Sequence, residues 1–226
     1  MTQGLHDKRP LTEDEMARRV AQEVKEGNCV NLGAGMPFPV TQYIPKDIWA
    51  LVHIEHGLLG VGGMAEGALK DRDLVGLGRR PITAVPGASC FSSVASFTML
   101  RGGHIDLGVL GAYEVSEKGD VANWLLPGQC PIVGGAMDIV GHVKRLIIMM
   151  THVTKKGEPK ILKECKLPVT AYGVVDLIVT DLAVIEVTSE GLLLREVVPG
   201  YTAEEIQTMT EPQLKVSPEL REIVVA

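Results

Sequence analysis

Glu55 is the residue whose type and position best suit it to chemistry in this chain. It directly follows an apolar run, residues 48–54, that is long enough for one buried strand, and a series of glycines begins at Gly57. Ligands of open α/β sheets bind at the carboxyl ends of strands, where glycines let the backbone approach a ligand closely. His53 and His56 flank the carboxylate and could orient it, although satisfied hydrogen-bonding histidines and a solvated glutamate fit the same pattern.

Two further glycine-rich turns could bring backbone close to a ligand. Gly33 and Gly35 follow the apolar stretch 29–32 and precede a short predicted helix, an arrangement whose free backbone N–H groups favour anions. Gly134 and Gly135 form the second turn. The first turn lacks the third glycine of G-x-G-x-x-G and the acidic residue expected on the next strand, so a dinucleotide site is poorly supported. Tight turns alone would also explain these glycines.

Other catalytic patterns have little support. The motifs G-x-S-x-G, H-E-x-x-H and G-x-x-x-x-G-K-[ST] are absent, which argues against a hydrolase elbow, a zinc protease and a P-loop. His104 and Asp106 could share one face of a strand, but no third ligand accompanies them, so no metal site is predicted. Asn123 could contact a ligand, although its neighbour Trp124 could simply anchor the long loop that holds both.

Composition limits the class of protein. The chain has 226 residues, 46% of them hydrophobic and 22% charged, with a formal net charge of -6. We therefore expect one domain over residues 1–226, with residues 1–11 as a loose leader, and no nucleic-acid partner. No apolar run reaches the roughly 18 to 20 residues that span a bilayer, so we expect a soluble, cytoplasmic protein with no membrane partner.

The cysteines give no sign of a metal site or of disulfides. They are far apart and form no C-x-x-C pair, so we expect them to be reduced and mostly buried. They are Cys29, Cys90, Cys130 and Cys165.

Hydrophobic periodicity and turn residues predict the order of the elements. The predicted helices span residues 13–26, 39–43, 92–100 and 203–209. The predicted strands span residues 29–32, 48–54, 82–85, 105–110, 143–153, 177–180, 182–187 and 192–198. The segments 65–80 and 115–133 are predicted to be loops.

Local signals support several of these boundaries. Thr12 and Glu15 form a capping box for the first helix, and Gly27 is expected to end it. In the third predicted helix, Phe91, Val94, Ala95 and Met99 are expected to face inward. A hairpin turn is predicted at residues 190–191.

The alternation of apolar strand, glycine turn and helix is typical of a parallel sheet covered on both faces. We therefore predict an α/β fold with a mostly parallel open sheet, helices on both faces, and a C-terminal part rich in β-hairpins.

The residues around Glu55 also carry a family resemblance. The run E-H-G-L-L-G at residues 55–60 resembles the E-N-G-L-L-G motif of the B subunits of class I coenzyme A transferases, the 3-oxoacid CoA-transferase family. Six further segments resemble that family's segments in the same order. They are residues 31–37, 86–89, 101–106, 119–124, 134–138 and 167–170. The resemblance covers about residues 12–218 and implies the family's three-layer α/β fold.

The resemblance implies a role for each candidate residue. Glu55 would be the nucleophile that forms an acyl-glutamyl anhydride and then a glutamyl-CoA thioester, and Gly135 would place a backbone N–H at the thioester oxygen. Coenzyme A would be part of the substrate, with no permanently bound cofactor. The residues expected to bind CoA or substrate are Gly33, Gly35, Gly57, Asn123 and Gly134.

The resemblance also implies a partner. The family's enzymes combine an A half and a B half, and this chain resembles the B half, so we expect a separate A subunit in an α2β2 heterotetramer. His56 stands where the family usually has asparagine, a departure that bears on the choice of acyl group. Segments 131–138 and 154–160 resemble the 3-oxoadipate type, while acetoacetate and short-chain acids also fit the resemblance. Two further hypotheses are a non-catalytic assembly subunit of the same fold and a Rossmann-like oxidoreductase.

Overall fold

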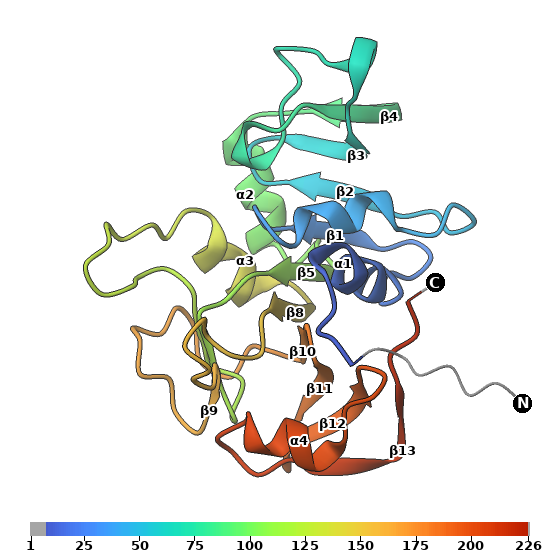
Figure 1. The fold of residues 1–226 in the computed structure, drawn as a ribbon. Helices are drawn as coiled ribbons and strands as arrows, with labels where there is room; N and C mark the ends of the chain where they lie inside the picture. The colour runs from blue at the N-terminus through green and yellow to red at the C-terminus, as the bar shows by residue number, and fades with distance from the viewer. Residues whose placement is uncertain (1–7, 226) are drawn as a thin grey trace, which may run out of the picture.

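A single large sheet organises the chain. The computed structural model describes residues 8–225, and its ten-stranded sheet has the order β13-β12-β11-β10-β8-β5-β1-β2-β3-β4 (Figure 1). Its strands are β1 (Cys29–Leu32), β2 (Leu51–Ile54), β3 (Leu58–Met64), β4 (Ile82–Cys90), β5 (Leu107–Leu110), β8 (Arg145–Met150), β10 (Leu177–Thr180), β11 (Ala183–Thr188), β12 (Gly191–Val197) and β13 (Lys215–Glu222). A small sheet has the order β7-β6-β9, with strands β6 (Glu114–Ser116), β7 (Val121–Ala122) and β9 (Ile161–Leu162).

Short helices complete the chain. The α-helices are α1 (Glu13–Ala21), α2 (Ser93–Arg101), α3 (Ala136–His142) and α4 (Ala203–Thr208). The 3-10 helices are η1 (Phe38–Gln42), η2 (Gly67–Leu69) and η3 (Leu77–Arg79). No helix within residues 8–225 is long and apolar enough to cross a membrane.

The centre of the large sheet is parallel. Strands β10, β8, β5, β1 and β2 run parallel to one another. Antiparallel pairing adds β3 and β4 on one side and β11 and β12 on the other, and β13 pairs in parallel with β12 at the edge. The turn between β11 and β12 brings Thr188 opposite Gly191, at the predicted hairpin. The predicted fold class is therefore confirmed.

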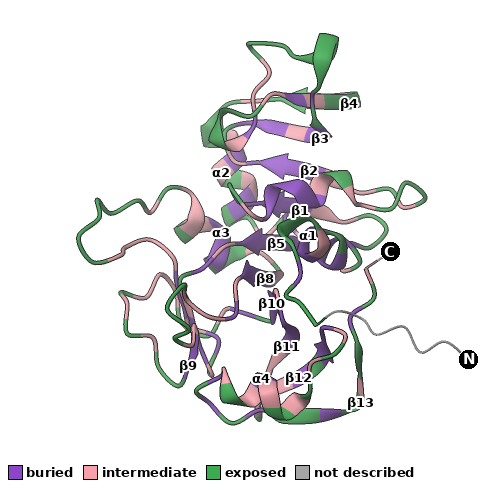
Figure 2. Cartoon of the chain, viewed as in Figure 1, coloured by how far each residue is buried: buried purple, intermediate pink, exposed green. Residues whose placement is uncertain are grey.

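Each face of the sheet packs against its own hydrophobic core. Along β8, Ile147 and Met149 belong to the core beneath α1 and η1, while the alternate residue Ile148 belongs to the core beneath α2 and α3. This alternation follows from the two-residue period of a strand, and both sets of side chains are buried (Figure 2). Layers of helix on both faces bury the strands near the middle of the sheet, including β2, which precedes Glu55.

Helix α1 begins as predicted but ends early. The Thr12 side chain accepts from the Glu15 amide and the Glu15 carboxylate accepts from the Thr12 amide, so the capping box is present. The prediction that the helix continues through residue 26 is wrong. Beyond Ala21, the amides of Glu23 and Val24 donate to carbonyls three residues back, at 2.9 and 3.2 Å, and these tight turns replace the α-helical pattern before the chain enters β1.

The glycine-rich stretch after Glu55 forms a strand rather than a loop close to a ligand. Strand β3 pairs with both β2 and β4, and its glycines make room for β4. A Cβ at Gly62 would lie 2.8 Å from Thr83 Oγ1, and one at Gly60 would lie 3.0 Å from Ala88 Cβ. Strand β4 also continues past its predicted end at Val85, because an edge strand tolerates a proline such as Pro86 that cannot donate.

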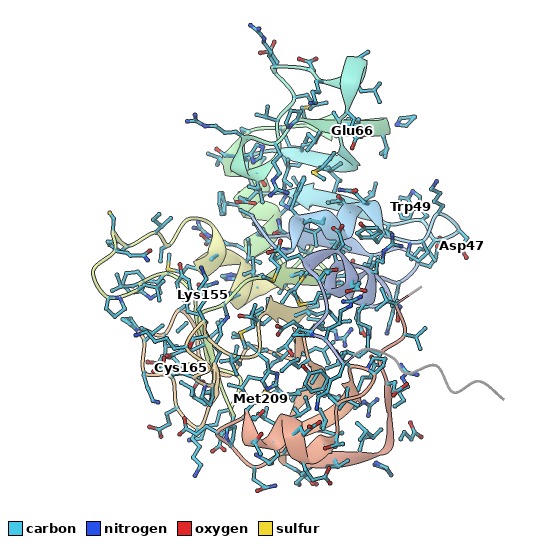
Figure 3. The ribbon with its side chains drawn as sticks, viewed as in Figure 1. Asp47, Trp49, Glu66, Lys155, Cys165 and Met209 are labelled. Carbon is cyan, nitrogen blue, oxygen red and sulfur yellow. The ribbon has the colours of Figure 1, made fainter. Side chains whose placement is uncertain are left out.

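Three other local predictions are wrong. The apolar run 48–54 yields a strand only from Leu51, and Trp49 is 61% exposed on the loop before β2 (Figure 3). In α2 the inward residues are Ser96 and Leu100, whereas Val94 is 76% exposed. The predicted loop 115–133 contributes two strands to the small sheet.

Two expectations concern the cysteines and the chain start. Cys90 and Cys130 are exposed, so the cysteines are not mostly buried. Within the predicted leader, residues 1–7 lie outside the described residues. Leu11 is buried, and its amide donates to Asp181 O at 2.8 Å.

Candidate active site

Glu55 lies in the turn between β2 and β3, at the carboxyl end of a buried parallel strand. The amide of Gly57 donates to Ile54 O at 3.0 Å, which closes the turn. Gly57 has a φ of 120°, and a Cβ there would lie 2.0 Å from Phe91 O. Only glycine fits this position, so the turn that presents Glu55 depends on Gly57.

Gly135 lies directly against the Glu55 side chain. A Cβ at Gly135 would be 3.2 Å from Glu55 Cγ and 3.2 Å from Phe97 Cζ. Residues far apart in the sequence are therefore in contact at the point where α3 begins. The Gly135 N–H donates no hydrogen bond to any of the described residues.

The environment of the Glu55 carboxyl is poor in hydrogen-bond donors. Its Oε2 is buried and has no hydrogen-bond partner among residues 8–225. Burial raises the pKa of this carboxyl above its usual value, an effect opposed by its own backbone amide and by the charge of His56. A buried polar atom without a partner is costly to the fold and is typical of a functional site.

A chain of buried side chains supports the strand that precedes Glu55. Asn31 Nδ2 lies 3.0 Å from His53 Nδ1, and Ser96 Oγ lies 2.8 Å from His53 Nε2. An amide NH2 can only donate, so we assign the tautomer in which Nδ1 accepts and Nε2 donates to Ser96. Burial lowers the pKa of His53 to about 4, with a smaller contribution from His56. His53 is therefore neutral and holds β1, β2 and α2 together.

His56 has a different environment. Its side chain is exposed, and Nε2 donates to Val75 O at 3.0 Å. This bond fastens the segment between β3 and β4 beside the Glu55 turn.

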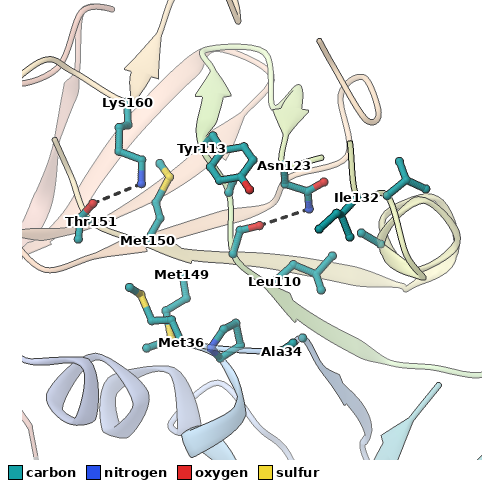
Figure 4. Close-up of a pocket in the computed structure, with 16 residues that line it drawn as sticks. Ala34, Met36, Leu110, Tyr113, Asn123, Ile132, Met149, Met150, Thr151 and Lys160 are labelled. Atoms are coloured by element: carbon teal, nitrogen blue, oxygen red, sulfur yellow. Dashed lines mark hydrogen bonds between the residues drawn. The ribbon is translucent and has the colours of Figure 1, made fainter. Parts of the chain in front are cut away.

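A cavity of about 350 Å³ opens next to Gly135 (Figure 4). Its lining includes Gly33, Asn123 and Ala136, the last of which directly follows Gly135. Asn123 is held in place because its Nδ2 donates to Gly111 O at 3.3 Å and its Oδ1 accepts from Thr170 Oγ1 at 2.8 Å.

The predicted site residues fall into two groups. Glu55 and Gly135 are in contact, and Gly33 and Asn123 line the adjoining cavity. Gly35, Gly57 and Gly134 are not among the residues that line it. Gly35 lies between the lining residues Ala34 and Met36, and Gly134 adjoins Gly135, whereas Gly57 shapes the Glu55 turn.

Sequence reasoning missed several residues that surround the site. Ser96 forms a hydrogen bond with His53, and Phe97 lies beside Gly135. The other two, Tyr113 and Lys160, line the cavity. A serine in an amphipathic helix carries no signal of its own. The sequence draws attention to Lys160 only through its loop, residues 154–160, which is basic and resembles the 3-oxoadipate type.

Comparisons with known proteins identify the family of this chain. A family model described as coenzyme A transferase matches residues 13–208. The B subunit of the probable succinyl-CoA:3-ketoacid coenzyme A transferase of Bacillus subtilis (strain 168) is 46% identical over 203 residues, which is 89% of this chain and 94% of that protein. The B subunit of the 3-oxoadipate CoA-transferase of Acinetobacter baylyi is 44% identical over 202 residues, 88% of this chain and 93% of that protein.

Solved structures show the same fold. The acyl-CoA transferase apoenzyme from Escherichia coli O157:H7 superimposes with a TM-score of 0.75 at 20% identity. The match covers 96% of this chain and 44% of that one, so this chain spans less than half of that protein. At this identity the likeness concerns the fold alone.

Proposed function

Because the chain belongs to the coenzyme A transferase family, we propose that it is the B subunit of an enzyme that moves coenzyme A between an acyl-CoA and a carboxylic acid. The family resemblance of the sequence is thereby confirmed. The finer proposal is that transfer proceeds through a thioester on Glu55. The observation that carries it is a Glu55 side chain with one buried, unpaired carboxyl oxygen, packed so closely on Gly135 that a Cβ there would lie 3.2 Å from Glu55 Cγ.

The proposed reaction uses a carboxylate as both nucleophile and leaving group. A Glu55 oxygen attacks the thioester carbonyl carbon, and the C–S bond breaks. The CoA thiolate is released, and an acyl-glutamyl anhydride remains. The thiolate then attacks the glutamyl carbonyl carbon, expelling the donor acid and forming the glutamyl-CoA thioester. An acceptor acid repeats these steps in reverse. The glutamyl-CoA thioester contains the same kind of bond as the substrate thioester, so the two lie close in energy, with the anhydrides as the higher-energy species between them.

The surroundings of Glu55 suit this chemistry. With few donors to solvate it, the ionised carboxylate is a stronger nucleophile than one in water. The free N–H of Gly135 supplies a donor beside the position where negative charge develops on a carbonyl oxygen. Such a fixed donor contributes on the order of 3 kcal/mol to the transition state.

An A subunit is proposed to complete the site. Both relatives described above are named as B subunits. Around the cavity and α3, large apolar side chains are exposed to solvent, including Ile132 at 75% and Met137 at 55%. A partner surface that covers them would also exclude water from Glu55, and we propose that the two chains form an α2β2 heterotetramer.

Trapping the intermediate tests the proposed function. The chain assembled with an A subunit is incubated with acyl-CoA, treated with borohydride, and digested for mass mapping. We expect reduction at Glu55, because borohydride reduces a glutamyl thioester and leaves a free carboxylate unchanged. An unmodified Glu55 peptide under conditions of active transfer would rule out the thioester.

Substituting Gly135 with alanine should lower turnover by about 100-fold. The φ of Gly135 is -80°, which alanine adopts without strain, so the change acts through the new Cβ, which would lie 3.2 Å from both Glu55 Cγ and Phe97 Cζ. Steady-state kinetics of the assembled enzyme measure this effect. Gly141→Ala in the same helix is the control, because a Cβ there meets nothing within 4 Å. Equal activity of the two variants would contradict a close fit at Gly135.

A further inference from the structure

Lys160 introduces a charge into an otherwise neutral cavity. Of the 16 residues that line the cavity, it is the one with an ionised side chain, and most of the rest are apolar or glycine (Figure 4). In the close-up, Lys160 lies at one end of the cavity and Ile132 at the other. Ile132 is three residues before Gly135 in the chain, and the Ala136 amide donates to Val133 O at 3.3 Å, so the end opposite Lys160 is the one nearer Gly135.

The backbone holds Lys160 firmly in this position. Its amide donates to His152 O at 3.2 Å, and its carbonyl accepts from the Val115 amide at 3.0 Å. Its Nζ donates to Thr151 Oγ1 at 3.3 Å, and Thr151 in turn donates to Val153 O at 3.0 Å. A lysine ammonium has three donors, so two remain after the bond to Thr151.

The charge of Lys160 is not neutralised by an acid. None of the ion pairs formed among residues 8–225 involves it. Burial lowers the pKa of its ammonium, and the carboxylate of Asp181 opposes this from beyond ion-pair distance. A partly buried cation with free donors is stabilised by an anionic ligand that pairs with it.

The walls of the cavity favour one class of anion. Met36, Met149 and Met150 present flexible thioethers that fit an aliphatic chain. The phosphates of coenzyme A carry several charges, which one lysine among apolar walls would leave largely unpaired. A single carboxylate on a short aliphatic chain matches both the one charge and the apolar walls.

Resting on the proposed function, we infer that Lys160 binds the distal carboxylate of a dicarboxylic acid substrate whose other carboxylate reacts at Glu55. The bound acid would extend along the cavity, with its carbon chain against the methionines. Lys160 thus selects dicarboxylic over monocarboxylic acids.

Two acids of equal length test this inference. With acetyl-CoA as donor and the assembled enzyme, we expect Lys160→Met to lower kcat/KM for succinate by 10- to 100-fold, mainly through KM, and that for butyrate by less than threefold. Lys160→Arg should restore most of the preference for succinate. Lys155→Met is the control, because Lys155 is exposed on the same loop (Figure 3) and should behave as the native chain.

Calorimetric titration of the same assembled proteins with succinate and butyrate separates this inference from the proposed function. Weaker binding of succinate alone in Lys160→Met supports a carboxylate site even if no variant shows transfer. Equal losses for both acids, or succinate binding that does not depend on Lys160, would overturn the inference while leaving the transferase function intact. Gel filtration confirms that each variant assembles, and Lys160→Gln, which also removes the charge, replaces Lys160→Met if the latter does not.

Discussion

Replacing Glu55 with glutamine is expected to lower CoA transfer by about four orders of magnitude or more. Glutamine has nearly the same shape, so it fills the space beside Gly135, but its amide cannot attack a thioester or leave as a carboxylate. The measurement is kcat/KM of the assembled enzyme with an acyl-CoA and an acceptor acid. Activity above about 1% of the native value would mean that Glu55 is not the nucleophile.

His56→Asn is the matched control for this experiment. His56 adjoins Glu55, but its side chain is exposed and its bond reaches Val75 O. We expect this variant to stay within tenfold of native turnover, corresponding to about 1.4 kcal/mol. A loss comparable to that of Glu55→Gln would show that the turn as a whole, rather than the carboxylate, carries the effect.

The pH dependence of stability of the native chain and of Glu55→Gln tests whether position 55 is buried in the folded chain. Burial raises the pKa of Glu55 in the folded chain, so below about pH 4 the carboxyl is neutral in both the folded and unfolded states. As pH rises, the unfolded chain ionises first, and the free energy of unfolding falls relative to that of Glu55→Gln until the folded carboxyl has also ionised. The thermal unfolding midpoint of Glu55→Gln should match that of the native chain near pH 4 and exceed it near pH 8.

Substituting Gly57 with alanine is expected to destabilise the fold by roughly 3 kcal/mol or more. The φ of 120° strains any residue with a Cβ, and the new Cβ would lie 2.0 Å from Phe91 O. This contact is with backbone, which cannot move aside as a side chain could. Moving it would also disturb Phe91, whose ring stacks on His53 at 6.1 Å between centroids. The midpoint of urea unfolding of the full chain measures the loss.

Gly63→Ala separates backbone strain from the steric clash. Gly63 has a similar φ of 110°, but the nearest atom to a new Cβ is Gln42 Cγ at 3.9 Å. We expect this variant to lose about 1 to 3 kcal/mol through strain alone. If both variants lose the same stability, the contact with Phe91 contributes nothing.

At the site, neighbouring residues in the sequence predict backbone turns but not which side chains are buried. Each family motif fixes only the shape of its own backbone turn, and the fold brings Glu55 and Gly135 together at the start of α3. By contrast, the predicted inward face of α2 was wrong. Apolar spacing favoured Val94, yet Ser96 is buried there because the His53 imidazole needs a hydrogen-bond partner.

By itself, the sequence determined the alternating α/β pattern, the capping box at Thr12, and Glu55 at the end of a buried strand. These features depend on residues a few positions apart, whose spacing sets strand, turn and helix directly. Tertiary structure alone decided that Glu55 Oε2 is buried without a partner and that Lys160 shares a cavity with Gly33 and Asn123. Burial and charge at these atoms are set by segments far apart in the chain, because desolvation depends on everything packed around a group rather than on its neighbours in sequence.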